Sequence, residues 1–159
     1  MHVSRGTMSN PLHQAFLEAG QQAGYPYTED VNGFQHEGVG PFDRTIHKGQ
    51  RWSAAQAYLH PVLNRPNLTA RDKAMTLRVL FEGDKAIGVE YVHNNQVLRA
   101  KAEKEVILSG GSINSPQLLM LSGVGDEKEL KEHGIPVVNH LPGVGKNLQD
   151  HLEVYVQQV

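Results

Sequence analysis

The sequence of 159 residues contains no cysteine, which excludes a disulfide framework, thiolate catalysis and a metal site with cysteine ligands. No apolar run approaches the roughly 18 residues that a membrane-spanning helix needs, so no transmembrane segment is predicted. Residues 1–10 have neither a signal-peptide core nor an arginine-rich amphipathic presequence. The formal net charge is only −2, and lysine and arginine are scattered among the acids. This balance predicts no nucleic-acid partner.

Two motifs of common catalytic sites are also missing. The nine histidines include no His-x-x-x-His or His-Glu-x-x-His pair, so no metal site is predicted. Gly-x-Ser-x-Gly, the sequence around the nucleophile of many serine hydrolases, does not occur. The overall composition, with 39% hydrophobic and 20% charged residues, is typical of a globular domain.

The first part of the chain predicts two helices separated by a loop. Asn10 as N-cap and Pro11 in the first turn predict a helix that ends at Gly24. Its apolar face is formed by residues at helical spacing: Leu12, Ala15, Phe16, Ala19 and Ala23. Residues 25–50 are rich in glycine, proline and asparagine with isolated aromatics, which favours an ordered loop over a larger surface. A second helix is predicted at 53–63, with inward residues Ala54, Ala57, Tyr58 and Val62.

From residue 75 the apolar period changes to two, which is typical of strands. Three runs are separated by a turn at 82–85 and by a tight hairpin turn at Asn94 and Asn95. The pattern predicts a three-stranded antiparallel meander over 75–102 that leads into a further strand at 105–108.

Residues 109–125 are the most informative segment of the sequence. The predicted strand leads into Gly110 and Gly111 and then into an apolar helix, with Ser115 as predicted N-cap and Pro116 as its first residue. Paired glycines at the carboxyl end of a strand let the backbone approach a ligand closely, as at the nucleotide sites of α/β sheets. The helix 116–122 then presents an apolar face that requires a sheet.

The residues after this helix are interpreted as having structural roles. Asp126 caps a short helix over 126–133, Glu129 has the spacing of a capping box, and Gly134 ends it. Residues 135–138 predict an extended edge piece, and Gly143 and Gly145 predict a turn.

Taken together, residues 109–125 and 143–151 resemble the glucose/methanol/choline (GMC) oxidoreductases, which are FAD-dependent alcohol oxidases and dehydrogenases. The resemblance is carried by a signature that the chain fills without a departure: Gly111, Ser112, Ser115, Pro116, Leu118, Leu119, Ser122, Gly123, Val124 and Gly125. Residues 31–61 and 106–116 are most similar to the choline-oxidising members. The similarity extends through essentially the whole chain.

The resemblance implies an α/β fold with α+β elements, made of part of a Rossmann-like FAD-binding domain with a β-meander and part of a substrate domain. Residues 1–70 would be substrate-domain-like helices and loops, 71–145 a portion of the FAD-binding domain, and 146–159 the start of a return to the substrate domain.

The resemblance also implies roles for particular residues toward FAD. Thr76 stands where the family usually has a valine whose backbone meets the adenine, and Ser109, Gly110 and Gly111 would close around the adenosine half. Asn147 and Asp150 would support the site at the domain boundary without touching the cofactor.

The family's amino-terminal Gly-x-Gly-x-x-Gly and its carboxyl-terminal catalytic His and His/Asn pair do not occur in this sequence. We therefore expect an internal segment of a longer enzyme, with the catalytic residues beyond Val159. His151 is not expected to be the catalytic base.

The resemblance implies oxidation of an alcohol, choline to betaine aldehyde, with electrons passed to a respiratory acceptor. It also implies a mitochondrial, inner-membrane-associated enzyme. Two alternatives stay open: a GMC enzyme for another alcohol, and a catalytically inactive protein that binds a nucleotide or a partner.

Overall fold

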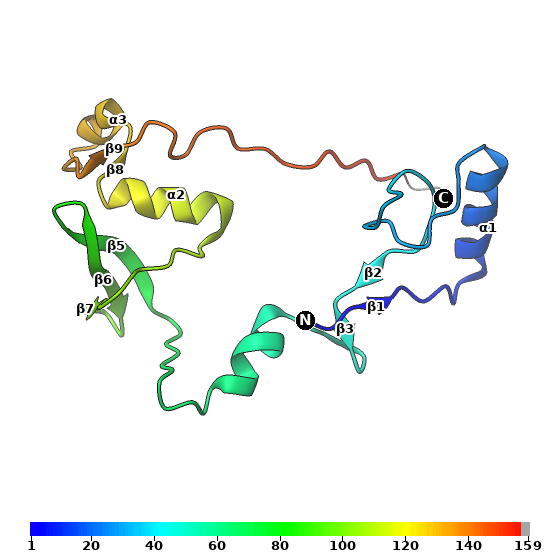
Figure 1. Ribbon diagram of the computed structural model, residues 1–159, viewed down its shortest axis with the longest axis horizontal. Helices are drawn as coiled ribbons and strands as arrows, with labels where there is room; N and C mark the ends of the chain where they lie inside the picture. The colour runs from blue at the N-terminus through cyan, green and yellow to red at the C-terminus, as the bar shows by residue number, and fades with distance from the viewer. Residues whose placement is uncertain (157–159) are drawn as a thin grey trace. The chain divides into compact units, whose positions relative to one another are not determined.

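A computed structural model describes residues 1–156, and its chain divides into two units, Met1–Ala70 and Arg71–Val159. Of the range 146–159 predicted to return to the substrate domain, residues 157–159 lie outside the described residues. Figure 1 shows helices and small sheets in both parts of the chain, which agrees with the predicted mixture of helix and strand.

The first helix of the first unit is α1, Pro11–Gln22, as predicted. The Asn10 side chain accepts a hydrogen bond from the Leu12 N–H at 2.9 Å, which satisfies one of the unpaired donors of the first turn. Gly24, with φ of +92°, follows the helix. Leu17 is the buried residue of α1, whereas Leu12 and Phe16 on the predicted apolar face are exposed.

Short strands that the sequence did not reveal occur before α1 and at the end of the predicted loop over 25–50. Strand β1, Ser4–Arg5, pairs with β2, Asp43–Arg44, and β3, Ile46–His47, pairs with β4, Gln50–Arg51. Each strand has only two residues, too short for an apolar alternation to be visible in the sequence.

The predicted second helix is present but is not α-helical. It consists of a π-helix, η1, Ala55–Leu59, followed by a 3₁₀ helix, η2, His60–Val62. The His60 N–H donates to the Ala55 carbonyl, five residues earlier, and Pro61 has no N–H to continue an α-helical ladder. The inward prediction is wrong for Ala54 and Tyr58, which are exposed.

The second unit is built on the predicted meander of β5, Met75–Glu82, β6, Lys85–His93, and β7, Gln96–Lys101. Both predicted turns are confirmed. Asn94 and Asn95 have φ of +50° and +59°, as a two-residue type I′ hairpin requires. Two register shifts interrupt the β5–β6 ladder, because Leu77 and Ile87 are each an extra residue in their strand.

An ion-pair bridge ties the three strands together on one face. The Glu90 carboxylate accepts hydrogen bonds from Arg78 Nε on β5 and from Arg99 Nε on β7, both at 2.9 Å. The hydrogen bond from Arg78, followed by that from Arg99, lowers the pKa of Glu90. The folded state therefore holds this carboxylate ionised more strongly than the unfolded chain does.

We expect Glu90→Gln to destabilise the chain at neutral pH and to have a smaller effect in acid. Because the folded pKa is depressed, the stabilisation is present above the ordinary glutamate pKa of about 4.3 and is lost as the pH falls through the folded pKa. Urea denaturation followed by circular dichroism at pH 7 and below pH 4 measures this difference. Glu82→Gln, at the exposed end of β5, is the matched control. An equal loss for Glu90→Gln at both pH values would contradict the prediction.

The predicted strand at 105–108 is wrong, because no described segment pairs with it and Ile107 is 75% exposed. The helix that follows, α2, spans Gly111–Leu121 with Gly110 as N-cap. The prediction that Ser115 caps this helix and that Pro116 opens it is therefore also wrong. The φ of +88° at Gly111 turns the chain directly into the helix, and Pro116 lies inside it.

Helix α2 packs on β5 (Figure 1), and Ser122 joins the two elements. The buried Ser122 hydroxyl accepts from the Val79 N–H at 2.8 Å and donates to the Leu118 carbonyl at 2.5 Å. Helix α2 thus contacts the edge strand of the meander, but none of its residues is buried, and Leu121 on the predicted apolar face is exposed.

Strand β8, Val124–Gly125, pairs in parallel with β9, Asn139–His140, and between them lies α3, Glu127–Glu132. Asp126 is the predicted N-cap of α3, and its carboxylate accepts from the N–H groups of Lys128 and Glu129. The Glu129 carboxylate accepts a hydrogen bond from Lys146 Nζ at 3.2 Å. It therefore does not make the bond to the Asp126 N–H that the predicted capping box requires. Residues 135–138 form no strand. Among the described residues, no helix is both long and apolar enough to cross a membrane.

Candidate nucleotide site

A cavity of about 590 Å³ lies between α2, β5 and the segment that leads from β7 into α2. Three of the four predicted cofactor-binding residues line it: Thr76, Ser109 and Gly110. Gly111 follows directly but is not part of the lining. The complete lining is Met75, Thr76, Val89, Val106, Ile107, Leu108, Ser109, Gly110, Asn114, Ser115, Gln117, Leu118 and Leu121.

The α2 wall of the cavity follows from helical periodicity. Asn114, Leu118 and Leu121 recur at spacings of four and three, which places them on one face of a helix. Because the sequence predicted this helix to start only at Pro116, it placed Asn114 in the preceding loop and missed it. The actual start, five residues earlier, adds an amide side chain to the site.

The loop over the cavity is fixed by a serine and a glycine. The Gly110 N–H donates to the Ser115 hydroxyl at 2.9 Å, so Ser115 holds the main chain where it enters α2. At Gly111 the φ of +88° lies in the left-handed region, which side chains rarely adopt. A Cβ at this position would meet no atom within 4 Å, so the requirement for glycine there is one of backbone conformation.

The chemistry of the lining suits a neutral ligand group with a flat apolar body and a polar edge. Apolar side chains from β6, 106–108 and α2 are combined with hydroxyl and amide groups from Thr76, Ser109, Asn114 and Gln117. Among the described residues, this lining contains no ionisable side chain. The cavity's size lies in the usual range of about 300–1,000 Å³ for ligand pockets.

The second half of the signature segment has a structural role. Ser122, Gly123, Val124 and Gly125 are all buried, and their contacts join α2 to β5 and β8 to β9. Met120, on the far side of α2, lies 3.1 Å from where a Cβ at Gly125 would stand. Asn147 and Asp150 are exposed and do not line the cavity. The Asp150 carboxylate accepts from the His151 N–H at 2.8 Å.

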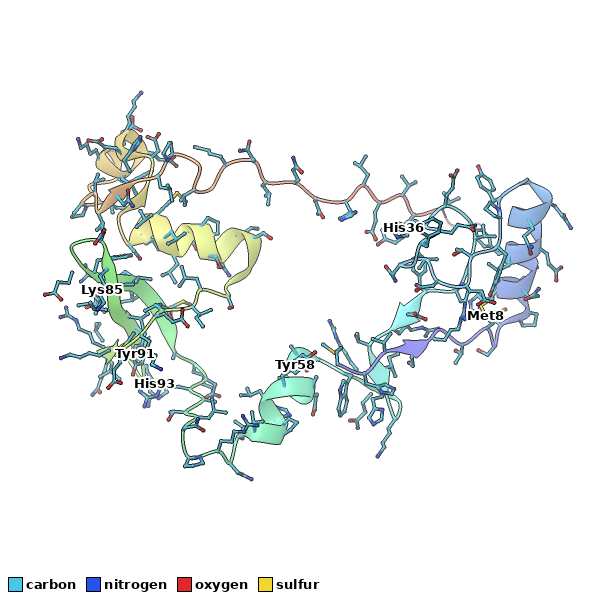
Figure 2. All side chains as sticks on the ribbon, viewed as in Figure 1. Met8, His36, Tyr58, Lys85, Tyr91 and His93 are labelled. Atoms are coloured by element: carbon cyan, nitrogen blue, oxygen red, sulfur yellow. The ribbon has the colours of Figure 1, made fainter. Side chains whose placement is uncertain are left out.

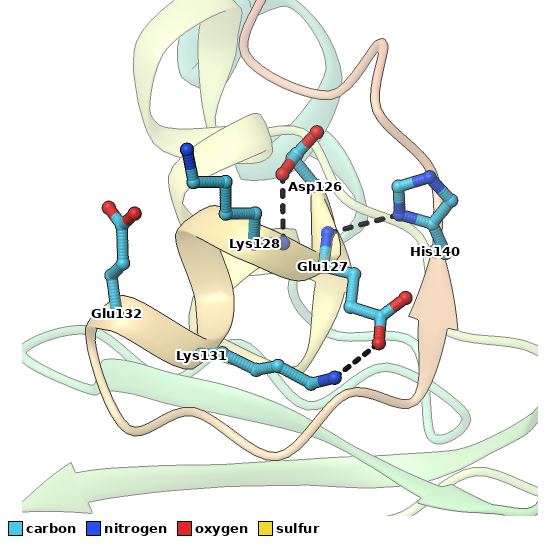
Figure 3. A pocket seen from close by; sticks show the side chains of 6 residues that line it. All are labelled: Asp126, Glu127, Lys128, Lys131, Glu132 and His140. Atoms are coloured by element: carbon cyan, nitrogen blue, oxygen red, sulfur yellow. Dashed lines mark hydrogen bonds and ion pairs between the residues drawn. The ribbon is translucent and has the colours of Figure 1, made fainter.

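A second depression, of about 640 Å³, is lined by charged side chains around α3 (Figure 3). Four of its six lining residues have partners: Asp126 caps the helix, Glu127 pairs with Lys131, and His140 Nδ1 accepts from the Glu127 N–H at 3.0 Å. The bond from Lys131 lowers the pKa of Glu127, and that from the Glu129 N–H lowers the pKa of Asp126. These charges are explained by the ends of α3, so this depression is the weaker candidate. Within residues 1–156, no group of three or more His, Cys, Asp or Glu could hold a metal ion.

The comparisons with known proteins agree with the resemblance seen in the sequence. The model of the GMC oxidoreductase family matches residues 1–153, so the chain belongs to the GMC oxidoreductase family. It is 68% identical over 158 residues to the mitochondrial choline dehydrogenase of Homo sapiens, a match that covers 99% of this chain and 27% of the relative. It is 53% identical over 158 residues to the oxygen-dependent choline dehydrogenase of Brucella anthropi, covering 99% and 29%. The chain therefore spans between a quarter and a third of the length of these relatives.

Solved structures give the same family fold. Pyridoxine 4-oxidase from Mesorbium loti superposes with a TM-score of 0.87 at 34% identity, covering 94% of this chain and 30% of the enzyme. A formate oxidase superposes with a TM-score of 0.81 at 33% identity, covering 89% and 24%. The predicted family and fold class are thus confirmed.

Proposed function

We propose that this chain holds the adenosine half of FAD in a GMC oxidoreductase that oxidises choline to betaine aldehyde. The observation that carries the proposal is the cavity that brings Thr76, Ser109 and Gly110 together. The family pattern assigns the same three residues to the cofactor, independently of the cavity.

The residues present fit the adenosine group. Adenine needs apolar contact on its faces and hydrogen-bond partners at its edge, and Val106, Leu108 and Leu118 can supply the former. Main-chain groups at Ser109 and Gly110 can reach the ligand closely, because Gly110 has no side chain in the way. The absence of an ionisable group in the described lining suits a neutral nucleoside better than a phosphate.

In this proposal the flavin supplies the electron acceptor for the alcohol's hydride when it is bound. The chain's own contribution is to bind and orient the adenosine end, and no catalytic residue is proposed within the described residues. Electron transfer to a respiratory acceptor and a mitochondrial, inner-membrane-associated location belong to the same proposal. The similarity to the human mitochondrial enzyme supports the mitochondrial part.

A chimera tests the function. In human choline dehydrogenase, the segment matched by this chain is replaced by residues 1–159, and the product is purified. We expect it to retain FAD and to reduce a dye in the presence of choline, because the replaced segment is 68% identical. The 159-residue chain alone, supplied with excess FAD, is expected to give no choline-dependent reduction. A chimera without bound FAD would overturn the proposed cofactor role, and turnover by the chain alone would overturn the scaffold role.

Two observations favour other functions. Pyridoxine 4-oxidase and formate oxidase are structural neighbours of this chain, which supports a different substrate within the same family. A substrate screen of the complete natural enzyme distinguishes such a substrate from choline.

The second observation concerns the first unit. Leu12, Phe16 and Phe42 are each more than 70% exposed, which is the surface expected of a protein that binds a partner. A catalytically inactive binding protein would bind a nucleotide as the isolated 159-residue chain, without the rest of a GMC enzyme.

A further inference from the structure

One polar side chain of the nucleotide cavity has no structural explanation in the fold. Asn114 lies inside helix α2, where asparagine is a weaker helix former than alanine. The side chain is exposed, and within the described residues 1–156 its amide makes no hydrogen bond to another residue. The fold itself thus supplies no reason for an amide at this position.

Asn114 stands at the end of the cavity where the predicted cofactor residues lie. It shares one face of α2 with Leu118 and Leu121, which also line the cavity. The Asn114 Cβ lies 3.1 Å from the place where a Cβ at Gly110 would stand, so these two residues are neighbours. Because side chains of a helix lean toward its N-terminus, the amide is directed toward the loop that contains Ser109 and Gly110.

The other polar side chains around the cavity are poorly suited to distinguish one base from another. A hydroxyl, as on Thr76 and Ser109, can donate or accept a hydrogen bond. The Ser115 hydroxyl already accepts from a main-chain N–H. Tyr91, which lies opposite Thr76 and is labelled in Figure 2, does not line the cavity, and its hydroxyl is bonded to Arg71 Nη1.

A carboxamide has the donor and the acceptor that adenine requires. Its oxygen accepts from the N6 amino group and its own amino group donates to N7, which is the pairing by which asparagine and glutamine recognise adenine. Guanine presents two acceptors, O6 and N7, at the same edge. The carboxamide oxygen would then face an acceptor without a proton between them, so an asparagine favours adenine over guanine.

We propose that Asn114 is a specificity-determining residue of the nucleotide site, binding the N6–N7 edge of the adenine ring through its side-chain amide. The inference rests on the proposed function and deepens it, because it adds a base-recognising side chain on α2. The family pattern assigns adenine only to the main chain at Thr76, which lies on the β5 wall of the cavity.

The test uses ADP, 7-deaza-ADP and GDP as competitors of FAD for the apoprotein of the choline dehydrogenase chimera. Asn114→Ala should weaken ADP binding about tenfold, the factor that corresponds to about 1.4 kcal/mol, and should lower the preference for ADP over GDP by a similar factor. 7-Deaza-ADP has carbon in place of N7, so the same variant should weaken its binding by less than about threefold. The melting temperature of the apoprotein should not fall, because alanine is the better helix former.

Gln117→Ala is the matched control, since Gln117 is also an exposed amide of α2 in the same lining. Gln117 stands at the rim of the cavity, because it also lines a separate depression of about 500 Å³ together with Met120 and Lys146. Its replacement should leave ADP binding and the ratio of ADP to GDP affinity within about threefold of the parent. Equal losses of ADP binding in the Asn114→Ala and Gln117→Ala variants would overturn the particular role of Asn114.

Asn114→Asp provides a second variant, which keeps the shape of the side chain but replaces the amino donor by an acceptor. It should bind 7-deaza-ADP more tightly than ADP, because a carboxylate oxygen and the N7 lone pair repel each other. If Asn114→Ala weakens ADP and 7-deaza-ADP equally, the amide does not bind N7 and the proposal is overturned. A parent chimera without FAD would overturn the proposed function itself, whereas a parent with FAD and an Asn114→Ala variant that binds all three nucleotides normally overturns only the role of Asn114.

Discussion

Replacing Gly111 with valine in the choline dehydrogenase chimera is expected to remove most of its bound flavin. The φ of +88° at this position is costly for a residue with a Cβ, and most costly for a β-branched one. Leaving the left-handed region would rotate Ser109 and Gly110 out of the cavity lining and would move the Gly110 N–H away from Ser115. A penalty of about 1–2 kcal/mol corresponds to FAD binding weakened on the order of tenfold. The measurement is the ratio of flavin to protein absorbance after gel filtration.

Gly111→Asn distinguishes two reasons for a glycine at this position: the left-handed backbone conformation and close approach of the ligand. Asparagine adopts the left-handed region more readily than valine, and a Cβ here meets no protein atom within 4 Å. If only the backbone conformation matters, Gly111→Asn should keep most of its flavin. Equal loss for both variants would show that the ligand itself approaches Gly111. Undiminished flavin in Gly111→Val, at parental stability, would remove Gly111 from the site altogether.

The sequence predicted well those elements whose signals are local. Asn10 and Pro11 define the start of α1, and the Asn94–Asn95 pair defines a turn that only residues tolerant of positive φ form easily. These signals depend on side chains within a few residues of the element. Such local signals predict an element independently of its tertiary contacts.

The start of α2 could not be predicted in the same way. Ser115 followed by Pro116 has the composition of a helix N-terminus, and this local pattern favoured a start at 116. In the structure the Ser115 hydroxyl does bond to a main-chain N–H near the helix start, that of Gly110, but from inside the helix. The left-handed turn at Gly111 decides the boundary, and a glycine in the sequence does not reveal the sign of its φ.

The bulge at Leu77 was hidden by the apolar pattern itself. Leu77, Val79 and Phe81 alternate as in an unbroken strand, which would place Thr76 on the opposite face. Only the pairing with β6 shows the extra residue. The sequence therefore predicted Thr76 as a site residue from the family pattern alone, and the alternation did not reveal its register against β6.

Replacing Gly123 with alanine is expected to destabilise the second unit by more than the cost of a left-handed backbone alone. Gly123 is buried with φ of +87°, and a Cβ would overlap the Pro136 carbonyl oxygen and lie 2.9 Å from Val138 Cγ2. Relief of this overlap would disturb the Gly123 carbonyl, which accepts from the Val138 N–H at 2.8 Å and the Asn139 N–H at 3.1 Å. Backbone strain and overpacking together should cost about 2–4 kcal/mol of unfolding free energy.

Gly134→Ala is the matched control. The φ of Gly134 is +67°, but a Cβ there would meet open space, so only the smaller conformational cost applies. Hydrogen exchange at the Val138 and Asn139 amides in the chimera measures both variants, and equal loss of protection would show that the contact with residues 136–138 contributes nothing.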